Sequence, residues 1–576
     1  MNHHKTNHRV ILFSFVVVLS LWAFNNRIFG NGTFSSQRSD APNIILIVAD
    51  DLDANPIAFM PNLQSLLVVQ GASFTNYFVN VSLCCPSRAS MLRGQYAHNH
   101  QVLTNRSPNG GYERFRDLGH ESSTVATWLH DAGYRTVLIG KYLNGYPDRD
   151  STHVPPGWDE WYGVIKGHYI NYDVNENGRV VEYGTRPEEY ETDVQARKAL
   201  DFIRRTAGAQ PFFIYLAPYA PHGPARSARR HRNAFPGATA PRPPSFNEQD
   251  VSDKPAWVRS LPLLTDSDIA DIDDRYRDRL QSLLAVDEMI KSLIDTLAAM
   301  QQLDNTYIFF TSDNGYQLGE HRRKLNKNTS YDADIHVPLI VRGPGVPAGA
   351  AIEHIAVNID LATTFAELAG AAAPDFVDGV SLVPLLGDNL PPLKDWRQAL
   401  LVGHWRSPSD EDIVPEYQAL RTMEYLYVEY DTGERELYDR RNDPYELQSL
   451  HETAAPELLS QLSTQLALLR ACAGENCLIT EVEEEARSPE NFTLLQNYPN
   501  PFNPSTLIRF NLPKNEQVTL KVFDVYGQEV MTLVNQTMPA GEHRIVFDAA
   551  GLASGIYFYK IQADSFSNTR KALLLK

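Results

Sequence analysis

Short, unbroken apolar segments recur along the N-terminal part of the chain and constrain its fold more than any other feature. Residues 43–49 read NIILIVA, and similar runs occupy residues 136–139, 211–216, 306–310 and 338–341. Strands that are apolar on both faces are typical of a parallel sheet covered by helices on both sides. Helical patterns lie between the runs, the clearest at residues 280–297. The alternation predicts an α/β fold with a large, mostly parallel sheet flanked by helices.

The pattern changes after residue 398. Short strands such as residues 425–430 and 436–438 predict a smaller antiparallel sheet up to about residue 450, closed by a helix near residues 456–470. We therefore expect one domain over residues 42–398 and a C-terminal subdomain over residues 399–470. The acidic stretch at residues 481–485 predicts a linker over residues 471–490.

Residues 491–576 have the pattern of a separate unit. Polar and apolar side chains alternate in residues 507–510, 518–522 and 555–561, and turn residues such as Gly527 and Gly541 separate these runs. Short alternating strands between turns predict a small all-β sandwich.

Size and charge limit the classes of function. A chain of 576 residues is too long for one compact core, which agrees with several folding units. The formal net charge of -18 argues against a nucleic-acid-binding protein, which needs a basic face to neutralise phosphates. A few Lys and Arg side chains can still create a local positive pocket for an anionic substrate. The Pro- and Arg-rich segment 222–262 predicts a long surface excursion that shapes a substrate cleft.

The N-terminus has a basic start followed by an apolar run over residues 10–24. Such a run is short for a membrane span and fits the core of a signal peptide, so we assign residues 1–30 to a signal peptide and expect export. An uncleaved anchor is the alternative, because the polar stretch from Asn25 has no clean small-residue cleavage site.

Four cysteines occur in two pairs. Cys472 and Cys477 are spaced to close a small disulfide loop in an oxidising compartment. Adjacent cysteines such as Cys84 and Cys85 rarely bond to each other because the ring is strained. These two residues therefore need another explanation.

Two of the predicted buried strands run into polar, acidic pairs, Asp50-Asp51 and Asp313-Asn314. Ligands of open α/β sheets bind at the carboxyl ends of the strands, so both pairs are expected to converge there. Three carboxylates and an amide oxygen suit Ca²⁺ or Mg²⁺ better than Zn²⁺. The alternative for either pair alone is that it caps a following helix or turn.

Cys84 precedes a helix-start signal, because Pro86 is well suited to a first helical turn. A group at position 84 would then lie at the positive end of the helix, an anion-binding position, with Arg88 one turn later. Two alternatives remain from these residues: a small buried core cysteine, or a helix-terminal thiolate with a lowered pKa.

The segment Cys84-Cys85-Pro86-Ser87-Arg88, followed by Leu92 and Gly94, resembles the maturation motif of the formylglycine-dependent sulfatases. In that family a dedicated enzyme oxidises the first cysteine to formylglycine. The resemblance extends over residues 42–470 in ordered matches, which chance does not explain well. They lie at residues 49–51, 140–142, 218–222, 311–315, 319–321, 327 and 337–345. Residues 84–92, 96–100 and 140–144 are similar to the branch of N-acetylglucosamine-6-sulfatases.

The resemblance implies an alkaline-phosphatase-like fold and hydrolysis of sulfate monoesters of sugars, such as glycosaminoglycan-like polysaccharides or N-acetylglucosamine 6-sulfate. It implies Ca²⁺, with Mg²⁺ as the alternative, on Asp50, Asp51, Asp313, Asn314 and the modified Cys84. Hydrated formylglycine would be the nucleophile, and the metal would lower the pKa of its attacking hydroxyl.

The resemblance also assigns roles to other residues. Asp313 would accept the proton of the attacking hydroxyl, and His222 would be the acid for the leaving oxygen. Arg88, Lys141 and Lys327 would hold the sulfate oxygens, and His321 is expected among the substrate-binding residues. Taken singly, Lys141, His222 and Lys327 would be interpreted as surface or loop residues. His98 and His100 have the spacing of a metal pair, but we interpret them as loop or substrate-rim residues.

Two positions depart from the family pattern. Arg93 stands where the maturation motif usually has Thr, and Leu143 replaces a histidine that many sulfatases carry two residues after the lysine. Asn144 is the residue next to Leu143 that would compensate. Two rival functions follow: a phosphodiester or phosphonate hydrolase of the same superfamily, or a surface sugar-binding protein that Arg93 keeps unmodified and inactive.

The tail has a resemblance of its own. Residues 497–504 (NYPNPFNP), the run at 555–559 and the terminal KALLLK are similar to the C-terminal sorting domain of type IX secretion cargo. The resemblance implies a Gram-negative bacterium whose type IX machinery exports the protein to the cell surface or the medium. A carbohydrate-binding or fibronectin-like sandwich is the alternative.

Overall fold

The computed structural model describes residues 41–407, 413–480, 492–497, 500–563 and 566–575. The chain divides into two compact units, with the boundary between Thr480 and Glu481. The predicted signal peptide at residues 1–30 lies outside the described residues. No helix among the described residues is both long and apolar enough to cross a membrane.

A ten-stranded sheet lies at the centre of the first unit, counted over the described residues. Its five central strands, in the order β9-β1-β8-β4-β5, are all parallel. Antiparallel pairs extend the sheet at both sides, through β10 and β2 next to β9 and through β6 and β7 next to β5. The strands in spatial order are β11 (Ala350–Ile352), β2 (Ala72–Phe74), β10 (Leu339–Arg342), β9 (Thr306–Ser312), β1 (Asn43–Ala49), β8 (Phe212–Ala217), β4 (Arg135–Gly140), β5 (Glu160–Lys166), β6 (Tyr172–Glu176) and β7 (Arg179–Tyr183).

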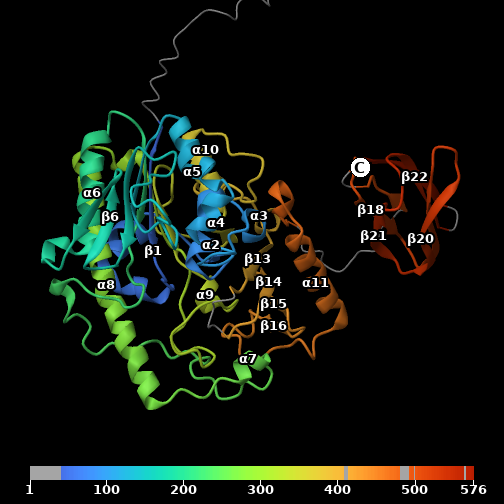
Figure 1. Ribbon diagram of the computed structural model, residues 1–576. Coiled ribbons are helices and arrows are strands. Elements are labelled where there is room, and N and C mark those ends of the chain that lie inside the picture. Colours follow the sequence, from blue (N-terminus) through green and yellow to red (C-terminus); the bar gives the residue numbers. More distant parts are fainter. Residues whose placement is uncertain (1–40, 408–412, 481–491, 498–499, 564–565, 576) are drawn as a thin grey trace, which may run out of the picture. The chain divides into compact units, whose positions relative to one another are not determined.

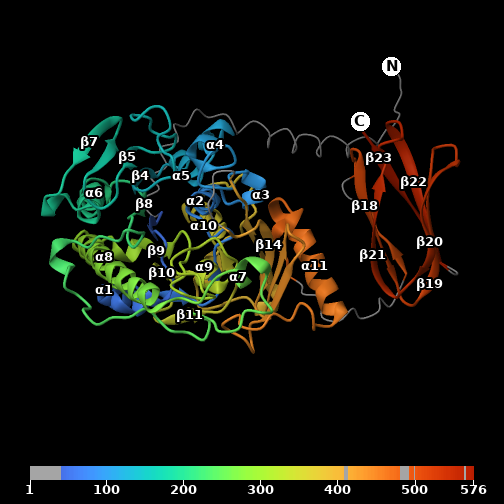
Figure 2. The same cartoon turned by 60° about the horizontal axis from the view of Figure 1, so that its bottom comes forward.

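Two apolar cores cover the two faces of this sheet. Alternate side chains of β1 show the division, because Ile44, Leu46 and Val48 belong to one core and Ile45 and Ile47 to the other. Helices α2 (Cys84–Arg93), α5 (Val125–Asp131) and α10 (Asp360–Ala369) pack in the first core. Helices α6 (Glu191–Thr206) and α8 (Asp266–Ala299) pack in the second. Figures 1 and 2 show the sheet between these two sets of helices.

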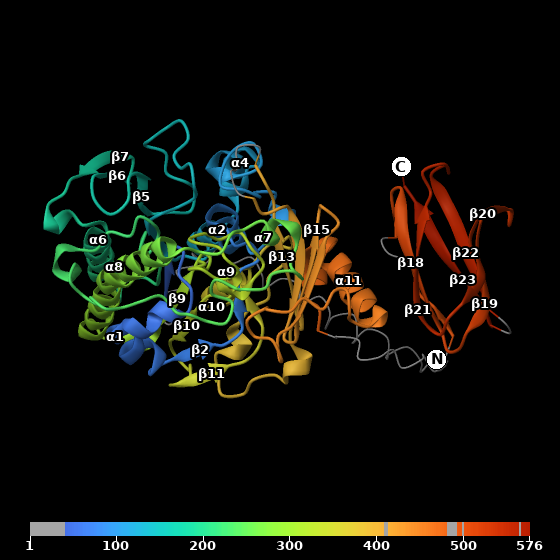
Figure 3. The same cartoon turned by 90° about the horizontal axis from the view of Figure 1, so that it is seen from below.

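The C-terminal part of the first unit is the predicted antiparallel sheet. Strands β13 (Ala399–His404), β14 (Tyr417–Thr422), β15 (Tyr425–Tyr430) and β16 (Arg435–Asp439) pair in sequence order. Helix α11 (Pro456–Arg470) packs against it, because Leu462, Leu466 and Leu469 are buried in the core. Figure 3 shows α11 beside β13 and β15. The helix has the bounds that the sequence predicts.

Residues 471–480 of the predicted linker belong to the first unit. Cys472 and Cys477 form the predicted disulfide and are buried in the core of the first unit. Apolar burial therefore holds this end of the first unit, and Thr480 is its last described residue. Residues 481–490 lie outside the described part of the chain.

The second unit is the predicted all-β sandwich. Its two sheets have the orders β17-β18-β21 and β20-β19-β22-β23, and their inward side chains form a separate core that includes Ile508, Phe510, Val518, Leu520 and Tyr559. The strands are β17 (Thr493–Leu494), β18 (Ser505–Leu512), β19 (Glu516–Phe523), β20 (Glu529–Met538), β21 (Gly541–Asp548), β22 (Gly555–Ala563) and β23 (Phe566–Leu574).

All five predicted strands of the large sheet are present, and the predicted fold class is confirmed. The strands that the sequence pattern did not indicate are β2 and β11, which are short, and β5, β6 and β7, which are partly polar. The remaining elements are short: α1 (Pro61–Leu63), β3 (Tyr77–Phe78), α3 (Ala97–His100), α4 (Gly111–Asp117), α7 (Ala256–Arg259), α9 (Asp332–Ile335) and β12 (Ala356–Val357).

Candidate active site

Four neighbouring parallel strands deliver polar side chains to one edge of the sheet. Asp50 and Asp51 follow β1, Asp313 follows β9, Lys141 follows β4, and His222 lies five residues after β8. The carboxyl ends of parallel strands meet at the same edge, which is where open α/β sheets bind their ligands. The strand order therefore gathers residues that are far apart in the sequence.

The two acidic pairs lie next to each other, as predicted. The backbone N–H of Asp51 donates to Asp313 Oδ1 at 3.0 Å, and Asn314 Nδ2 donates to Asp51 Oδ1 at 2.8 Å. Asp51 has a φ of 63°, a left-handed conformation that is unusual for Asp. Arg279 of α8 donates to the Asp51 carbonyl at 2.8 Å and so supports this turn.

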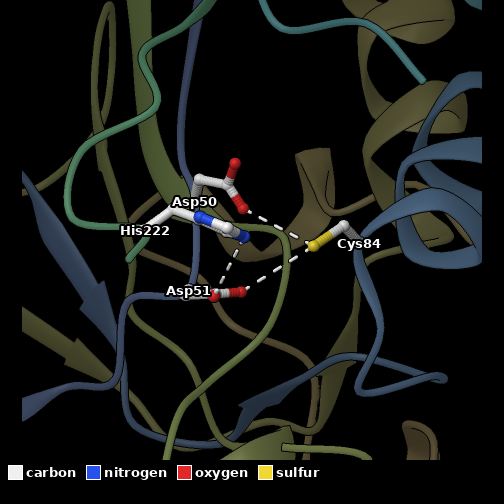
Figure 4. A group of neighbouring side chains, drawn as sticks. All are labelled: Asp50, Asp51, Cys84 and His222. Atoms are coloured by element: carbon white, nitrogen blue, oxygen red, sulfur yellow. Dashed lines mark hydrogen bonds and ion pairs between the residues drawn. The ribbon is translucent and has the colours of Figure 1, made fainter. Parts of the chain in front are cut away.

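Helix α2 brings Cys84 to these carboxylates. The helix begins at Cys84, and Pro86 stands in its first turn, as the sequence predicts. Cys84 Sγ lies 3.6 Å from Asp50 Oδ1 and 3.8 Å from Asp51 Oδ1 (Figure 4). Burial raises the pKa of the Cys84 thiol above its ordinary value, although Lys141 and Lys327 oppose this.

Three cationic side chains surround the carboxylates. Lys141 Nζ lies 2.6 Å from Asp50 Oδ2, and Arg88 Nε lies 2.7 Å from Asp313 Oδ2. Lys327 Nζ contacts Asp51 Oδ1 and lies 2.7 Å from Cys84 Sγ. Arg88 is fully buried, and its Nη2 has no hydrogen-bond partner among the described residues. A buried guanidinium with a free N–H group is a donor for an anion oxygen or a water molecule.

A glycine orients one of these cations. Gly140 has a φ of 111°, and a Cβ atom there would lie 2.2 Å from the carbonyl oxygen of Ala217. The next residue, Lys141, donates its backbone N–H to the same carbonyl at 2.9 Å. The close approach of β4 to β8 therefore requires glycine and directs Lys141 into the site.

The residues assigned to a metal fit a divalent cation. The carboxylate oxygens of Asp50, Asp51 and Asp313 and the amide oxygen of Asn314 are hard donors of the kind that Ca²⁺ and Mg²⁺ prefer. The ammonium of Lys327 contacts Asp51, Cys84 and Asn314 Oδ1, the last at 3.3 Å. Three of the five assigned residues therefore already converge on one cationic group. Asp50, Asp51, Cys84 and His222 also form a group with ligand atoms within 4.8 Å of one another.

The charges set the proton affinities of the three carboxyl groups. Burial raises the pKa of Asp313 above its ordinary value, Asp50 adds to this, and Arg88 opposes it. Burial acts the same way on Asp50 and Asp51, but nearby cations prevail and lower both pKa values, with Lys141 the main one at Asp50 and Lys327 at Asp51. Asp313 is therefore the most basic of the three.

His222 presents one ring nitrogen to the site. Its Nδ1 lies 2.7 Å from the carbonyl oxygen of Gly223, so this nitrogen carries a proton and donates it. Its Nε2 lies 3.7 Å from Asp51 Oδ2 (Figure 4). The nitrogen that can gain or lose a proton at the site is therefore Nε2.

A cavity of about 340 Å³ opens beside these residues. Lys141, Leu143, Asn144, Tyr219 and His222 line it, together with His168. His168 was missed in the sequence; it lies two residues after β5, at the same edge of the sheet, and its ring stacks with that of His222 at 6.1 Å between centroids. Asn144 Oδ1 is buried and has no hydrogen-bond partner among the described residues. The cavity wall around the apolar Leu143 therefore also contains two polar groups, the free amide oxygen of Asn144 and the imidazole of His168.

His321 lies in other surroundings. Its Nδ1 is 2.7 Å from Glu248 Oε2, its Nε2 is 4.0 Å from Glu446 Oε2, and its ring packs on Tyr331. No contact within the described ranges joins it to Cys84. Because these buried carboxylates hold it, the structure does not place His321 with the other predicted site residues, and its role in substrate binding stays a prediction.

Arg93 is accommodated by the fold. It stands in the last turn of α2, where a cation is favourable, and its guanidinium donates to Gln95 Oε1 and to the carbonyl of Ser123, both at 2.8 Å. His98 and His100 face other groups, with His98 Nε2 3.0 Å from the carbonyl of Cys472 and His100 Nε2 2.9 Å from Ser90 Oγ.

Comparison with known proteins gives matches over nearly the whole described chain. A family model described as Sulfatase matches residues 42–371, and one described as N-sulphoglucosamine sulphohydrolase, C-terminal, matches residues 319–472. A third, described as Secretion system C-terminal sorting domain, matches residues 496–575.

Two relatives are similar over most of their length. An N-acetylglucosamine-6-sulfatase of Capra hircus is 34% identical over 483 residues, with 77% of this chain and 86% of the relative covered. An N-acetylglucosamine-6-O-sulfatase of Bacteroides thetaiotaomicron is 27% identical over 489 residues, with 72% and 83% covered.

Solved structures share the fold. One, in complex with D-glucosamine-2-N,6-O-disulfate as its substrate, has a TM-score of 0.65 and 26% identity and covers 74% of this chain and 97% of its own. A phosphonate monoester hydrolase from Silicibacter pomeroyi has a TM-score of 0.58 at 24% identity, with 74% and 94% covered, which shows a common fold.

Proposed function

Since this chain belongs to the sulfatase family, we propose that it removes sulfate from sugar sulfate esters at the cluster around Cys84. The chain is a sulfuric ester hydrolase. The observation that carries the proposal is the position of Cys84 at the start of α2, 3.6 Å and 3.8 Å from two carboxylate oxygens and within reach of the cation Lys327.

The family implies that a divalent metal and formylglycine work at this site. We propose that Asp50, Asp51, Asp313 and Asn314 hold Ca²⁺ together with residue 84, which a maturation enzyme oxidises to formylglycine. The bound metal would supply a positive charge that favours the ionised form of the nucleophile.

The chain's own side chains would bind and orient the sulfate group. Arg88, Lys141 and Lys327 bring three cations to the point that Cys84 faces, and cations placed there stabilise negative charge that develops on sulfate oxygens. The Nη2 of Arg88, which has no partner among the described residues, would donate to one of these oxygens. Burial of these three side chains strengthens their interactions with the sulfate group, because little water is present to screen the charges.

Two residues would move protons. Asp313 has the highest proton affinity of the three carboxylates and would accept the proton of the attacking hydroxyl. His222 would donate a proton from Nε2 to the leaving sugar oxygen, because its Nδ1–H is held by the carbonyl of Gly223. His168 and Asn144 line the same cavity and would contact the sugar.

Sulfated sugars are the substrate class that the relatives support. Two of them are named for sulfate on the 6-position of N-acetylglucosamine, and a structural neighbour binds a disulfated glucosamine. We propose a glycosaminoglycan-like or other sulfated polysaccharide as the source of these sugars.

The sorting domain determines where the protein acts. Residues 496–575 match a secretion-system sorting domain, which indicates type IX secretion to the outside of the cell or its surface. Export through the inner membrane by the predicted signal peptide at residues 1–30 belongs to the proposal.

The test is peptide mass spectrometry of residue 84 in protein from the native host, combined with turnover assays. We expect the mass of an aldehyde in place of a thiol, hydrolysis of sugar sulfates, and no turnover by the Cys84→Ala variant. Cys85→Ala is the matched control and should stay active. An unmodified thiol would favour the inactive sugar-binding protein, and faster hydrolysis of phosphonate or phosphate esters would favour the rival hydrolase.

Metal removal is a second test of the site. Chelation should abolish turnover, and Ca²⁺ should restore it, because the carboxylates of Asp50 and Asp51 need a cation to bind an anionic substrate beside them. Restoration by Mg²⁺ but not by Ca²⁺ would contradict the proposed ion, and full activity in chelator would contradict a metal site.

A further inference from the structure

A second cavity lies beside the chain segment that follows His222. Its volume is about 590 Å³, larger than the 340 Å³ of the cavity beside Lys141. The segment after β8 and the middle of α8 form much of its wall, through Ala225, Arg226, Arg277 and Gln281. Part of the wall belongs to the Pro- and Arg-rich segment at residues 222–262, so the predicted surface excursion forms part of a cavity.

The lining of this cavity is strongly basic. It contains five arginines against two aspartates, a net formal charge of +3 in a chain whose net charge is -18. The basic residues are Arg186, Arg226, Arg229, Arg232 and Arg277, and the acidic ones are Asp274 and Asp278. A positive hollow in an acidic protein concentrates anions from solution.

Three of these arginines have no carboxylate partner among the described residues: Arg226, Arg229 and Arg232. Arg229 makes one weak hydrogen bond, to the carbonyl of Thr185 at 3.5 Å. Their neighbour Arg230 differs, because it is paired with Asp193 at 2.7 Å and with Glu288. The fold therefore neutralises Arg230 and leaves these three cavity arginines without a carboxylate partner, whereas Arg186 pairs with Glu188 and Glu189 and Arg277 pairs with Asp274.

Two short chain segments connect the basic cavity with the cavity of the active site. His168 and His222 line the smaller cavity, whereas Ile170 and Arg226 line the larger one. Arg226 is the fourth residue after His222, so their Cα atoms lie within about 15 Å of each other. Arg275 is a further cation beside this segment, because its Nη1 would be 2.9 Å from a Cβ atom placed at Gly223.

We propose that this cavity is a binding site for the anionic groups of a polysaccharide, which neighbour the sugar whose sulfate is removed. The inference rests on the proposed function and deepens it: the substrate is a chain with several sulfate or carboxylate groups rather than a singly sulfated sugar. Planar guanidinium groups suit such ligands, because they donate two parallel hydrogen bonds to sulfate or carboxylate oxygens.

The test measures binding of a heparin hexasaccharide, as a probe with many anionic groups, to the full chain. The variant R226Q/R229Q/R232Q should bind it about tenfold more weakly than the wild type, from three exposed ion pairs of modest strength each. Added salt should reduce binding by the wild type more than by the variant, since ions screen exposed charges. Turnover of N-acetylglucosamine 6-sulfate should stay unchanged.

A charge-matched variant, R179Q/R204Q/R435Q, removes three exposed arginines that do not line the cavity and should bind heparin like the wild type. Equal losses in both variants would show a net-charge effect and overturn the inference, as would unchanged binding in the first variant. A hexasaccharide stripped of sulfate but retaining its carboxylates distinguishes the two anionic groups. Failure of the wild type to hydrolyse any sulfate ester would refute the proposed function but leave this binding result interpretable.

Discussion

The ammonium of Lys327 contacts Asp51, Cys84 and Asn314, and the imidazole of His222 faces Asp51 from the side of the cavity. A divalent cation on those ligands would compete with the ammonium for Asp51. Lys327 would then be free to bind the sulfate of the substrate. At this scale the site is a balance of buried charges, because three carboxylates and three cations lie almost out of water.

His222 gives the prediction at the residue scale. The substitution His222→Gln should lower kcat for a sugar sulfate by about 10²–10⁴-fold, because a general acid contributes that much when the leaving group is a poor one. The loss should be far smaller for an aryl sulfate, whose leaving group needs no proton. Steady-state kinetics on both substrates checks this.

The control for this prediction is His130→Gln, a half-exposed histidine 3.4 Å from Asp159 and not among the residues that line the cavity. It should leave both rates unchanged. A loss in His222→Gln that is equal for sugar and aryl sulfates would exclude the role of acid.

At the scale of elements, the site depends on the order of five parallel strands. Each strand end supplies one part of the site: Asp313 follows β9, Asp50 follows β1, the His222 loop follows β8, Lys141 follows β4, and His168 follows β5. Anything that holds β4 and β5 in place therefore positions the cavity. One ion-pair group does so at the opposite ends of these strands, where Glu160 of β5 pairs with Arg135 of β4 at 3.0 Å and with Arg205 of α6 at 2.7 Å.

This group predicts a pH dependence of stability. Burial alone would raise the pKa of Glu160, but its hydrogen bonds with Arg205, Arg135 and Tyr162 lower it from 4.5 to about 2. The unfolded chain therefore binds a proton at a higher pH than the folded chain does. The contribution of Glu160 to stability is present above pH 4.5 and is lost as the pH falls toward 2.

Comparison of Glu160→Gln with the wild type isolates this contribution. The variant should be less stable by about 2 kcal/mol at pH 7, a value reduced because both arginines are partly exposed. The difference should shrink by about 1 kcal/mol at pH 4. Urea unfolding at the two pH values measures it, and a difference that is equal at both would contradict the prediction.

The whole molecule consists of two units with separate apolar cores. The residues assigned to catalysis all belong to the first unit, as does the disulfide between Cys472 and Cys477. The sorting sandwich after Thr480 has its own buried side chains. Secretion and catalysis are therefore carried by different parts of the chain.

A chain that ends at Thr480 should keep its activity and its melting temperature within about 2 °C, because the core of the first unit is complete without the sandwich. Calorimetry and turnover of a sugar sulfate check this against the full chain. The same truncation should abolish export from the native host. Loss of folding on truncation would show that the sandwich stabilises the catalytic unit.

Much of the fold and the core of the site follow from neighbouring residues along the chain. The apolar strand 43–49 with Asp50-Asp51 behind it, and Cys84 two residues before Pro86, are local patterns of burial, strand ending and helix start. Such preferences act over a few residues, so they can be recognised in the sequence without knowledge of the fold. The predicted strands, helix α11 and the convergence of the two acidic pairs were accordingly confirmed.

Other parts of the site depend on contacts between distant segments. His168 reaches the cavity because β5 pairs beside β4, Arg279 supports Asp51 from a helix that packs across the sheet, and Arg226 lines a cavity together with α8. His321 lies with Glu248 and Glu446 for the same kind of reason. Strand order and the packing of helices arise from burial of the whole apolar surface, and no local pattern of residues encodes which distant side chains that burial brings together.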